Sequence, residues 1–209
     1  MSHHVVIGGG PLGRAVVRSL RERGEPVRLV SRSARMQPAS GLEVFRADAK
    51  NAELLADAIS GADTVYHCAN APYHLWEQEL PPIWKGIIDA CRRANTRLII
   101  GTNLYALGDP NANDGDGVLR PGTKPQPCSR KGRVRAELED AALDAGRRGD
   151  LEVALVRASD FYGPEVESSV LGERFFGRLV EGKPAELYGS RNAAHSYAFL
   201  PDFAKTMVT

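Results

Sequence analysis

Three glycines near the start of the chain have the spacing of a phosphate-binding turn. The run GGGPLG fits a G-x-G-x-x-G pattern that directly follows an apolar stretch and opens an amphipathic one. Gly8 permits a tight turn, Gly10 lets a pyrophosphate approach the backbone, and Gly13 allows a helix to pack closely on a strand. A helix that begins at Pro11 and Leu12 would direct its free N–H groups at the phosphates. The pattern predicts a dinucleotide site, and the alternative is a turn that is merely rich in glycine.

The residues about 20 positions further on indicate which dinucleotide is bound. An NAD site usually has an acidic residue at the end of the second strand, where it holds the ribose 2′-hydroxyl. Here the corresponding segment ends in Ser31, Arg32 and Ser33, with Arg35 beyond. Serine hydroxyls and a guanidinium suit a 2′-phosphate, because arginine pairs with phosphate oxygens bidentately. We therefore expect NADP(H) rather than NAD(H); the alternative is that Arg32 is a solvated surface arginine.

Short β-branched runs alternate with longer helical patterns along the chain, as in βαβ units that build a parallel sheet. The runs are almost continuously apolar, which is expected when helices cover both faces of the sheet. The sequence therefore predicts an α/β fold with a doubly wound parallel sheet. The expected strands cover residues 4–7, 27–30, 43–46, 64–67, 97–101 and 153–157, and the expected helices cover residues 12–23, 52–59, 83–94 and 134–147.

Two stretches that interrupt the alternation are expected to be loops at the ligand-binding edge of the sheet. Residues 70–82 contain Tyr73, His74 and Trp76 among prolines, and aromatic side chains of this kind commonly line a substrate pocket. Residues 108–127 are rich in Gly, Pro, Asn and Asp. The remaining elements are expected in the tail, as a helix at 172–181, strands at 185–188 and 196–199, and a helix starting at Asp202.

Composition and charge exclude several classes of protein. The chain has 209 residues, and its 27 Lys and Arg nearly balance its 26 Asp and Glu, so nothing favours a nucleic-acid partner. No apolar run reaches the length of a membrane span. Cys68, Cys91 and Cys128 form no paired pattern, which predicts reduced thiols and no metal site. An apolar strand from residue 4 leaves no room for a signal peptide, so we expect a cytoplasmic protein.

Six segments together resemble one family, in the family's order. They are VVIGGGPLG, ADAKNAELLADAISGADTVYHCAN, RLIIGTNLYALGD, PCSRKGRVRAELE, VRASDFYGPEV and HSYAFLPDFAKTMV. The chain resembles the NAD-dependent epimerase/dehydratase branch of the short-chain dehydrogenase/reductase superfamily, in its extended or atypical form. The resemblance implies an NAD(P)-binding Rossmann core at residues 1–165. It also implies a reduced C-terminal extension on the substrate side at residues 166–209, from either a naturally short form or a truncated one.

The resemblance also implies roles for individual residues. Asp48 and Ala49 would lie beside the adenine, although Asp48 could instead cap a helix. Further contacts to the cofactor and substrate are implied for Cys68, Ala69, Asn70, Ser159 and Tyr162. His195 falls where the family often has arginine, so it would contact a substrate or simply begin a strand.

The family's usual catalytic residues are replaced in this chain. The serine or threonine position falls on Asn103, and the Y-x-x-x-K pair falls on Lys131 and Arg135. The first glycine of the family's G-x-x-G-x-x-G loop is Ile7. The alignment of the Y-x-x-x-K pair is fixed by the flanking residues Pro127, Ser129, Gly132 and Glu139.

The replacements have their own chemistry. Arg135 cannot deprotonate, so it would hold ribose hydroxyls or a phosphate. Lys131, near another cation and near the cofactor, would act as an acid or base. Asn103 would orient a substrate carbonyl, and Tyr105 is the nearest phenol that could replace the lost tyrosine. The alternative is that Lys131 and Arg135 are surface charges and Tyr105 is a packed aromatic residue.

These observations predict an NADP(H)-binding protein of the epimerase, dehydratase or reductase type with a non-standard catalytic set, acting on a small molecule that the sequence does not identify. One alternative is a non-catalytic dinucleotide sensor or regulator of the NmrA-like type, and another is an isomerase or lyase that has kept the nucleotide site. The resemblance suggests a homodimer packed through the helices at 83–94 and 134–147, although the arginines on those faces are equally consistent with solvent.

Overall fold

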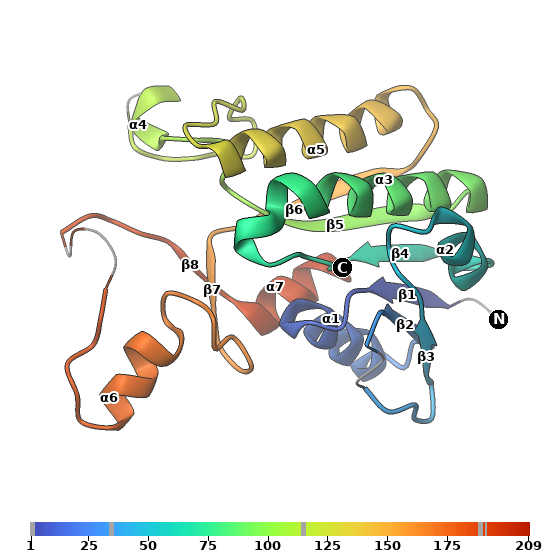
Figure 1. Cartoon of the computed structure of the whole chain (residues 1–209), viewed down its shortest axis with the longest axis horizontal. Coiled ribbons are helices and arrows are strands. Elements are labelled where there is room, and N and C mark those ends of the chain that lie inside the picture. Colours follow the sequence, from blue (N-terminus) through green and yellow to red (C-terminus); the bar gives the residue numbers. More distant parts are fainter. Residues whose placement is uncertain (1–2, 34–35, 114–115, 188–189, 191) are drawn as a thin grey trace.

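Six parallel strands form the main sheet of the protein, in the order β3-β2-β1-β4-β5-β6 (Figure 1). The computed structural model describes residues 3–33, 36–113, 116–187, 190 and 192–209. The doubly wound α/β fold predicted from the sequence is thereby confirmed. The strands are β1 (His4–Ile7), β2 (Val27–Ser31), β3 (Leu42–Arg46), β4 (Thr64–His67), β5 (Arg97–Asn103) and β6 (Val153–Ala158).

Helices cover both faces of this sheet, so each face has its own apolar core (Figure 1). On one face lie α1 (Pro11–Glu22) and α7 (Leu200–Met207). On the other lie α2 (Ala52–Ile59), α3 (Trp76–Ala94) and α5 (Arg130–Arg147). Strands buried on both faces explain why their sequences are continuously apolar instead of alternating.

The order of the strands creates a switch point beside β1. This strand pairs with β2 on one side and with β4 on the other, so the chain winds away from β1 in two directions. The loops that leave the carboxyl ends of β1 and β4 therefore diverge and leave a crevice between them, which is where such sheets bind ligands.

The prediction of a loop at residues 70–82 is wrong in its second half, which is helical. A short 3-10 turn, η1 (Tyr73–Leu75), leads directly into α3, which contains Pro81 and Pro82. Two prolines remove two backbone hydrogen bonds, but burial of Trp76 and Leu80 continues the apolar stripe of the helix and outweighs that loss. Helix α5 likewise begins earlier than expected, because the Ser129 hydroxyl caps it by accepting a hydrogen bond from the Gly132 N–H.

The tail differs most from expectation. Strands β7 (Asp160–Tyr162) and β8 (Tyr197–Phe199) form a separate two-stranded parallel sheet, and the sequence had suggested only the second. The expected helix at 172–181 divides into a π-helical turn, η2 (Gly172–Gly177), and α6 (Arg178–Val180). The described part of the expected strand at 185–188 is not a strand, since the Glu186 N–H donates to the Arg174 carbonyl instead of to a neighbouring strand. Loop 108–127 is interrupted by α4 (Pro110–Asn113).

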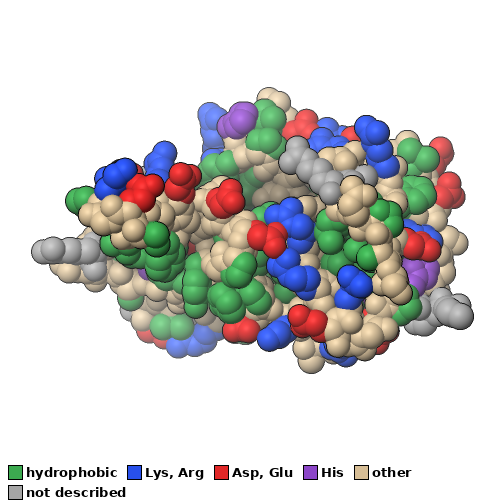
Figure 2. Space-filling view, turned by 90° about the horizontal axis from the view of Figure 1, so that it is seen from below, with side chains coloured by type: hydrophobic (Ala, Val, Ile, Leu, Met, Phe, Trp, Pro, Cys, Tyr) green, Lys and Arg blue, Asp and Glu red, His purple; other side chains and the backbone are tan. Residues whose placement is uncertain are grey.

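Apolar side chains remain on the surface around α6. Figure 2 shows hydrophobic side chains on the left-hand part of the molecule, where Figure 1 places this helix. Phe176 and Leu179 are about half exposed, and Val180 is 88% exposed. Within the described residues, none of the helices combines the length and the apolar character needed to cross a bilayer.

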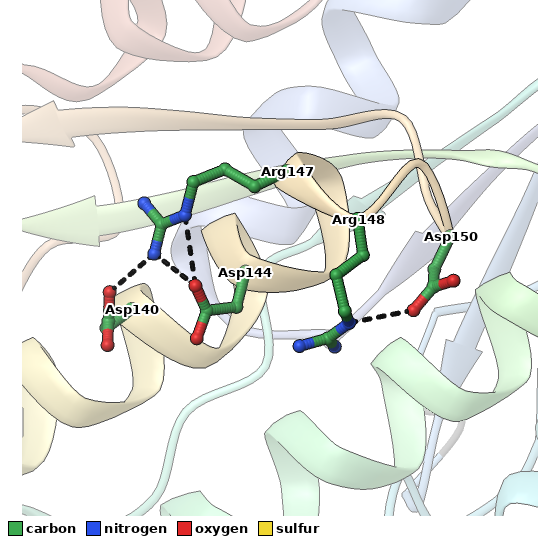
Figure 3. A network of polar contacts seen from close by, with 5 residues as sticks. All are labelled: Asp140, Asp144, Arg147, Arg148 and Asp150. Carbon is green, nitrogen blue, oxygen red and sulfur yellow. Dashed lines mark hydrogen bonds and ion pairs between the residues drawn. The ribbon is translucent and has the colours of Figure 1, made fainter.

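Many of the arginines are neutralised at the surface. At the end of α5, Arg147 pairs with Asp140 and Asp144, and Arg148 pairs with Asp150 (Figure 3). Such exposed pairs contribute little to stability. They spread the positive charge among carboxylates instead of gathering it into a basic patch.

Candidate functional site

A cleft of about 820 Å³ opens at the carboxyl edge of the main sheet. Its floor and walls come from the loop after β1, the end of β2, the loop after β4 and the end of β5. Tyr73 and Trp76 close its inner end together with Arg135, which projects from α5. The two loops that the sheet topology separates therefore line one continuous cavity.

Each glycine of the loop after β1 has a different surrounding. At Gly8, φ is +117°, and a Cβ atom would lie 2.6 Å from the Ala69 nitrogen. A Cβ on Gly13 would lie 1.7 Å from the Gly8 carbonyl oxygen. A Cβ on Gly10 would meet nothing within 4 Å. The chain's own packing therefore requires glycine at two of these positions, whereas Gly10 leaves open space on the cleft side.

The amino terminus of α1 is available to an anion. Gly10 is the N-cap residue, no side chain caps the helix, and Pro11 occupies its first turn. The N–H groups of Leu12 and Gly13 have no acceptor within the helix, as in the first turn of any α-helix. Open space at Gly10 beside these donors fits the pyrophosphate of a dinucleotide.

The end of β2 forms the outer wall of the cleft. Ser31, Arg32 and Ser33 all line it, and Arg32 is exposed to solvent. The Arg32 carbonyl accepts a hydrogen bond of 3.1 Å from the Arg46 Nε. Arg35 lies outside the described residues. Two hydroxyls and a cation with room to move are thus placed where a dinucleotide's adenosine ribose would lie.

Of the two residues expected beside an adenine, Ala49 lines the cleft and Asp48 does not. Ala49 lines the cleft, whereas Asp48 accepts a hydrogen bond from the Lys50 N–H outside it. The cap of α2 is Asn51, whose side-chain oxygen accepts from the N–H groups of Glu53 and Leu54. The alternative role of Asp48 as that cap is therefore wrong.

His67 shapes the loop that follows β4. Its Nδ1 accepts a hydrogen bond of 3.2 Å from the Ala69 N–H, and its ring packs edge-on against Trp84. Burial, helped by the nearby Arg135 charge, lowers the pKa of His67 to about 3. Burial also raises the pKa of the Cys68 thiol, so this cysteine is not a reactive thiolate. A neutral histidine and an inert cysteine thus support the cleft wall.

The buried His67 predicts an acid-sensitive fold. The unfolded chain binds a proton at this residue below a pKa of about 6.5, while the folded chain stays neutral until about 3. Stability is therefore lost as the pH falls through this window, by about 2 kcal/mol between pH 7 and pH 5. A His67→Asn variant keeps an acceptor for Ala69 but does not titrate. Urea unfolding should show a smaller loss between these pH values for the variant; equal losses would contradict the assignment.

Three aromatic rings and two cations form the inner end of the site. The Tyr73 and Trp76 ring centroids are 4.8 Å apart, and the Tyr73 hydroxyl donates to the Tyr105 hydroxyl at 2.9 Å. The Lys131 ammonium lies 3.1 Å from the centroid of the Tyr73 ring. The Arg135 guanidinium carbon lies 4.2 Å from the centroid of the Trp76 ring. Each cation is thus held by the face of an aromatic ring.

Arg135 is not a surface charge, so that alternative is wrong. The residue is 5% exposed, and its Nη2 donates to the Asn70 side-chain oxygen at 3.3 Å. Its Nε is buried with no hydrogen-bond partner. Burial lowers the pKa of Arg135 to about 10, so the group stays charged at neutral pH.

Tyr105 differs from a catalytic phenolate. Burial raises its pKa, and the hydrogen bond with Tyr73 raises it further. The phenol therefore remains protonated at neutral pH and can donate a hydrogen bond. Asn103 lines the cleft beside it, with its side-chain oxygen accepting from the Tyr105 N–H at 3.2 Å.

Several residues of the site escaped the sequence analysis. Thr102 lines the cleft and donates to the buried Glu139, which also accepts two hydrogen bonds from Arg157. In the sequence analysis, Glu139 was used only to fix the alignment of the Y-x-x-x-K pair. Asp160, which belongs to the segment VRASDFYGPEV that carries the resemblance, lines the cleft and lies 3.0 Å from the His195 Nε2.

Arg14, on α1, also lines the cleft, and the sequence analysis did not single it out. It donates to the Gly9 carbonyl and to Glu165, which Arg18 binds as well. These contacts join α1 to the segment after β7, at the edge of the cleft.

The structure divides the candidate residues into two sets. Those that line the cleft are Gly8, Gly10, Pro11, Leu12, Ser31, Arg32, Ala49, Cys68, Ala69, Asn70, Tyr73, Trp76, Asn103, Tyr105 and Arg135. Those that do not line it are Gly13, Asp48, His74, Lys131, Ser159, Tyr162 and His195. Within the second set, Lys131 reaches the site through Tyr73 and His195 reaches it through Asp160. Among the described residues, no three acidic, histidine or cysteine side chains are grouped to hold a metal ion.

The fold and its glycine loop define a nucleotide-binding α/β protein. Sequence comparison gives the family: the profile of the NAD dependent epimerase/dehydratase family matches residues 4–209. The chain therefore belongs to this family. Among curated protein sequences, no match is found.

Solved structures agree with this assignment. MoeE5 in complex with UDP-glucose and NAD is 25% identical, with a TM-score of 0.79 over 99% of this chain and 70% of its own. WbmH from Bordetella bronchiseptica, in complex with NAD⁺, is 21% identical, with a TM-score of 0.81 over 100% of this chain and 71% of its own. The UDP-N-acetylglucosamine 4-epimerase from Bacillus cereus is 19% identical, with a TM-score of 0.81 over 99% and 70%. At these identities, the last two structures show the fold alone.

Proposed function

We propose that the cleft binds NADP(H) and that the protein is an epimerase, dehydratase or reductase of its family with a non-standard catalytic set. The observation that carries this proposal is the pairing of two features in one cleft. The open space at Gly10 lies beside the uncapped amino terminus of α1, and Ser31, Arg32 and Ser33 line the wall beyond β2. MoeE5 and WbmH were solved with NAD, so a preference for a 2′-phosphate would distinguish this chain from both of them.

Different residues of the site would bind different groups of the cofactor and the substrate. The first turn of α1 would hold the pyrophosphate, and Arg32 with the neighbouring serines would hold the 2′-phosphate. A bound nicotinamide supplies hydride chemistry. Asn103 would donate a hydrogen bond to a substrate carbonyl, and the Lys131 ammonium would supply a proton near Tyr73. Tyr73 and Trp76 would face the substrate.

A second candidate, a dinucleotide sensor without turnover, is favoured by a specific observation. Lys131, the residue expected to act as an acid or base, does not line the cleft and lies over the Tyr73 ring. The hydroxyl of Tyr105, the nearest phenol, is engaged by the Tyr73 hydroxyl. A panel of carbonyl substrates with NADPH separates the two candidates: turnover that Lys131→Ala abolishes supports the enzyme, and binding without turnover supports the sensor.

Reversing the charge of Arg32 should reverse the preference for the dinucleotide. In Arg32→Glu, a carboxylate would repel the 2′-phosphate and accept hydrogen bonds from free ribose hydroxyls. NADPH affinity is expected to fall at least tenfold, while NADH affinity holds or rises, as measured by fluorescence titration. Arg93→Glu, an exposed residue on α3, is the charge-matched control. An unchanged preference in Arg32→Glu would remove the argument for NADP(H).

A further inference from the structure

Arg135 is a buried cation that has no counter-ion of its own. The side chain is 5% exposed and remains charged at neutral pH. None of the ion pairs found among the described residues includes it. A buried charge without a partner is costly, so such a group usually belongs to a site whose partner is a ligand.

The surrounding residues do not neutralise this charge. Glu139 is the carboxylate that acts on Arg135, but both of its oxygens are engaged, one by Thr102 and the other by Arg157. Asn70 offers only a neutral oxygen at 3.3 Å. The Lys131 ammonium lies over the neighbouring Tyr73 ring and adds a second positive charge. Asp160 also lines the cleft, but its carboxylate contacts His195 and forms no ion pair with Arg135.

Arg32 and Arg135 lie apart along the cleft. Arg32 follows β2, Arg135 meets Asn70 after β4, and β1 lies between these two strands. A dinucleotide whose 2′-phosphate and pyrophosphate are held at Arg32 and Gly10 has no further phosphate for Arg135. A ribose of the cofactor would bring hydroxyls but no charge to Arg135, so an anion there would come from another molecule.

We propose that Arg135 is the docking point for an oxyanion of the substrate, so that the substrate class is a carboxylate-bearing or phosphate-bearing small molecule. A planar guanidinium is suited to both groups, because its N–H donors match paired oxygen atoms. Asn70 and the stack on Trp76 fix the orientation of the guanidinium before the anion arrives. Assigning the anion to a substrate depends on the proposed function, whereas anion binding at Arg135 does not.

Trp76 provides a direct readout of this site. The chain has two tryptophans, so a Trp84→Phe background leaves only the indole that stacks on Arg135. Acetate and inorganic phosphate are titrated at constant ionic strength, with sodium chloride as the balancing salt. We expect a saturable change in Trp76 fluorescence with each oxyanion, and no saturable change would overturn the proposal.

Substitutions along α5 locate the binding. Arg135→Gln should raise the dissociation constant for phosphate at least tenfold, and Arg135→Lys should raise it less, because it keeps the charge but loses the planar donors. Arg133→Gln, an exposed arginine two positions away, should leave the constant unchanged. Circular dichroism verifies the fold of each variant. Equal affinities in Arg135→Gln and Arg133→Gln would refute the assignment to Arg135.

A last titration identifies the source of the anion. With NADPH at saturation, acetate and phosphate should still change the fluorescence, because the cofactor leaves Arg135 to the substrate. Loss of both responses would show that the cofactor fills the site and would overturn the substrate assignment. If NADPH itself does not bind, the proposed function fails, while the titrations without cofactor still decide whether Arg135 binds an oxyanion.

Discussion

Replacing Gly13 by alanine is expected to destabilise the protein by about 3 kcal/mol or more, an overpacking cost at the upper end of the usual range. The new Cβ would lie 1.7 Å from the Gly8 carbonyl oxygen, and Gly8 is itself held between Val30 and the backbone at Ala69. Alanine favours a helix over glycine by about 1 kcal/mol, which is too little to offset this clash. Urea unfolding followed by circular dichroism measures the change.

Gly10→Ala is the matched control on the same loop. A Cβ there would meet nothing within 4 Å, and φ of −76° suits any residue. Stability should therefore change by less than about 1 kcal/mol, while NADPH binding weakens at least tenfold because the methyl group occupies the approach to the helix terminus. Similar stability losses in both variants would contradict this reading of the loop.

Glu139→Ala is expected to cost about 3–5 kcal/mol. Glu139 is 2% exposed and accepts hydrogen bonds from Thr102 at 2.8 Å and from Arg157 at 2.7 and 2.9 Å. Its removal leaves an unpaired guanidinium and an unsatisfied hydroxyl beside the cleft, together with a cavity. Denaturant unfolding should show the loss, and Glu139→Gln should recover part of it by keeping the acceptor for Thr102.

Glu152→Ala serves as the surface counterpart, because Glu152 pairs with Arg97 in solvent. Its stability should hardly change, since exposed ion pairs contribute little. If the two alanine variants unfolded at the same denaturant concentration, the buried network would not have the role assigned to it.

The fold could be predicted because its signals are local. Continuous apolar runs identify strands covered on both faces, and the glycine spacing identifies the turn between β1 and α1. The start of α3 was missed because Pro81 and Pro82 argue against a helix locally, while the burial that stabilises it comes from distant elements.

The site was predictable only where its residues are consecutive. Gly8 and Gly10, or Ser31 and Arg32, lie together in the sequence, so a motif could reveal them. Thr102 meets Glu139 from 37 residues away, and nothing in the sequence marks that contact. The alignment singled out Arg135, but the sequence alone left open whether this residue is buried or lies at the surface. Its burial and its packing against Trp76 decide the question.

Fluorescence titration of the unmodified protein with NADPH and with NADH tests the central claim most directly. We predict that NADPH binds with enhanced nicotinamide fluorescence and at least tenfold more tightly than NADH, because only NADPH has a 2′-phosphate for Arg32 to bind. Failure of both dinucleotides to bind at millimolar concentration would contradict the assignment of the cleft.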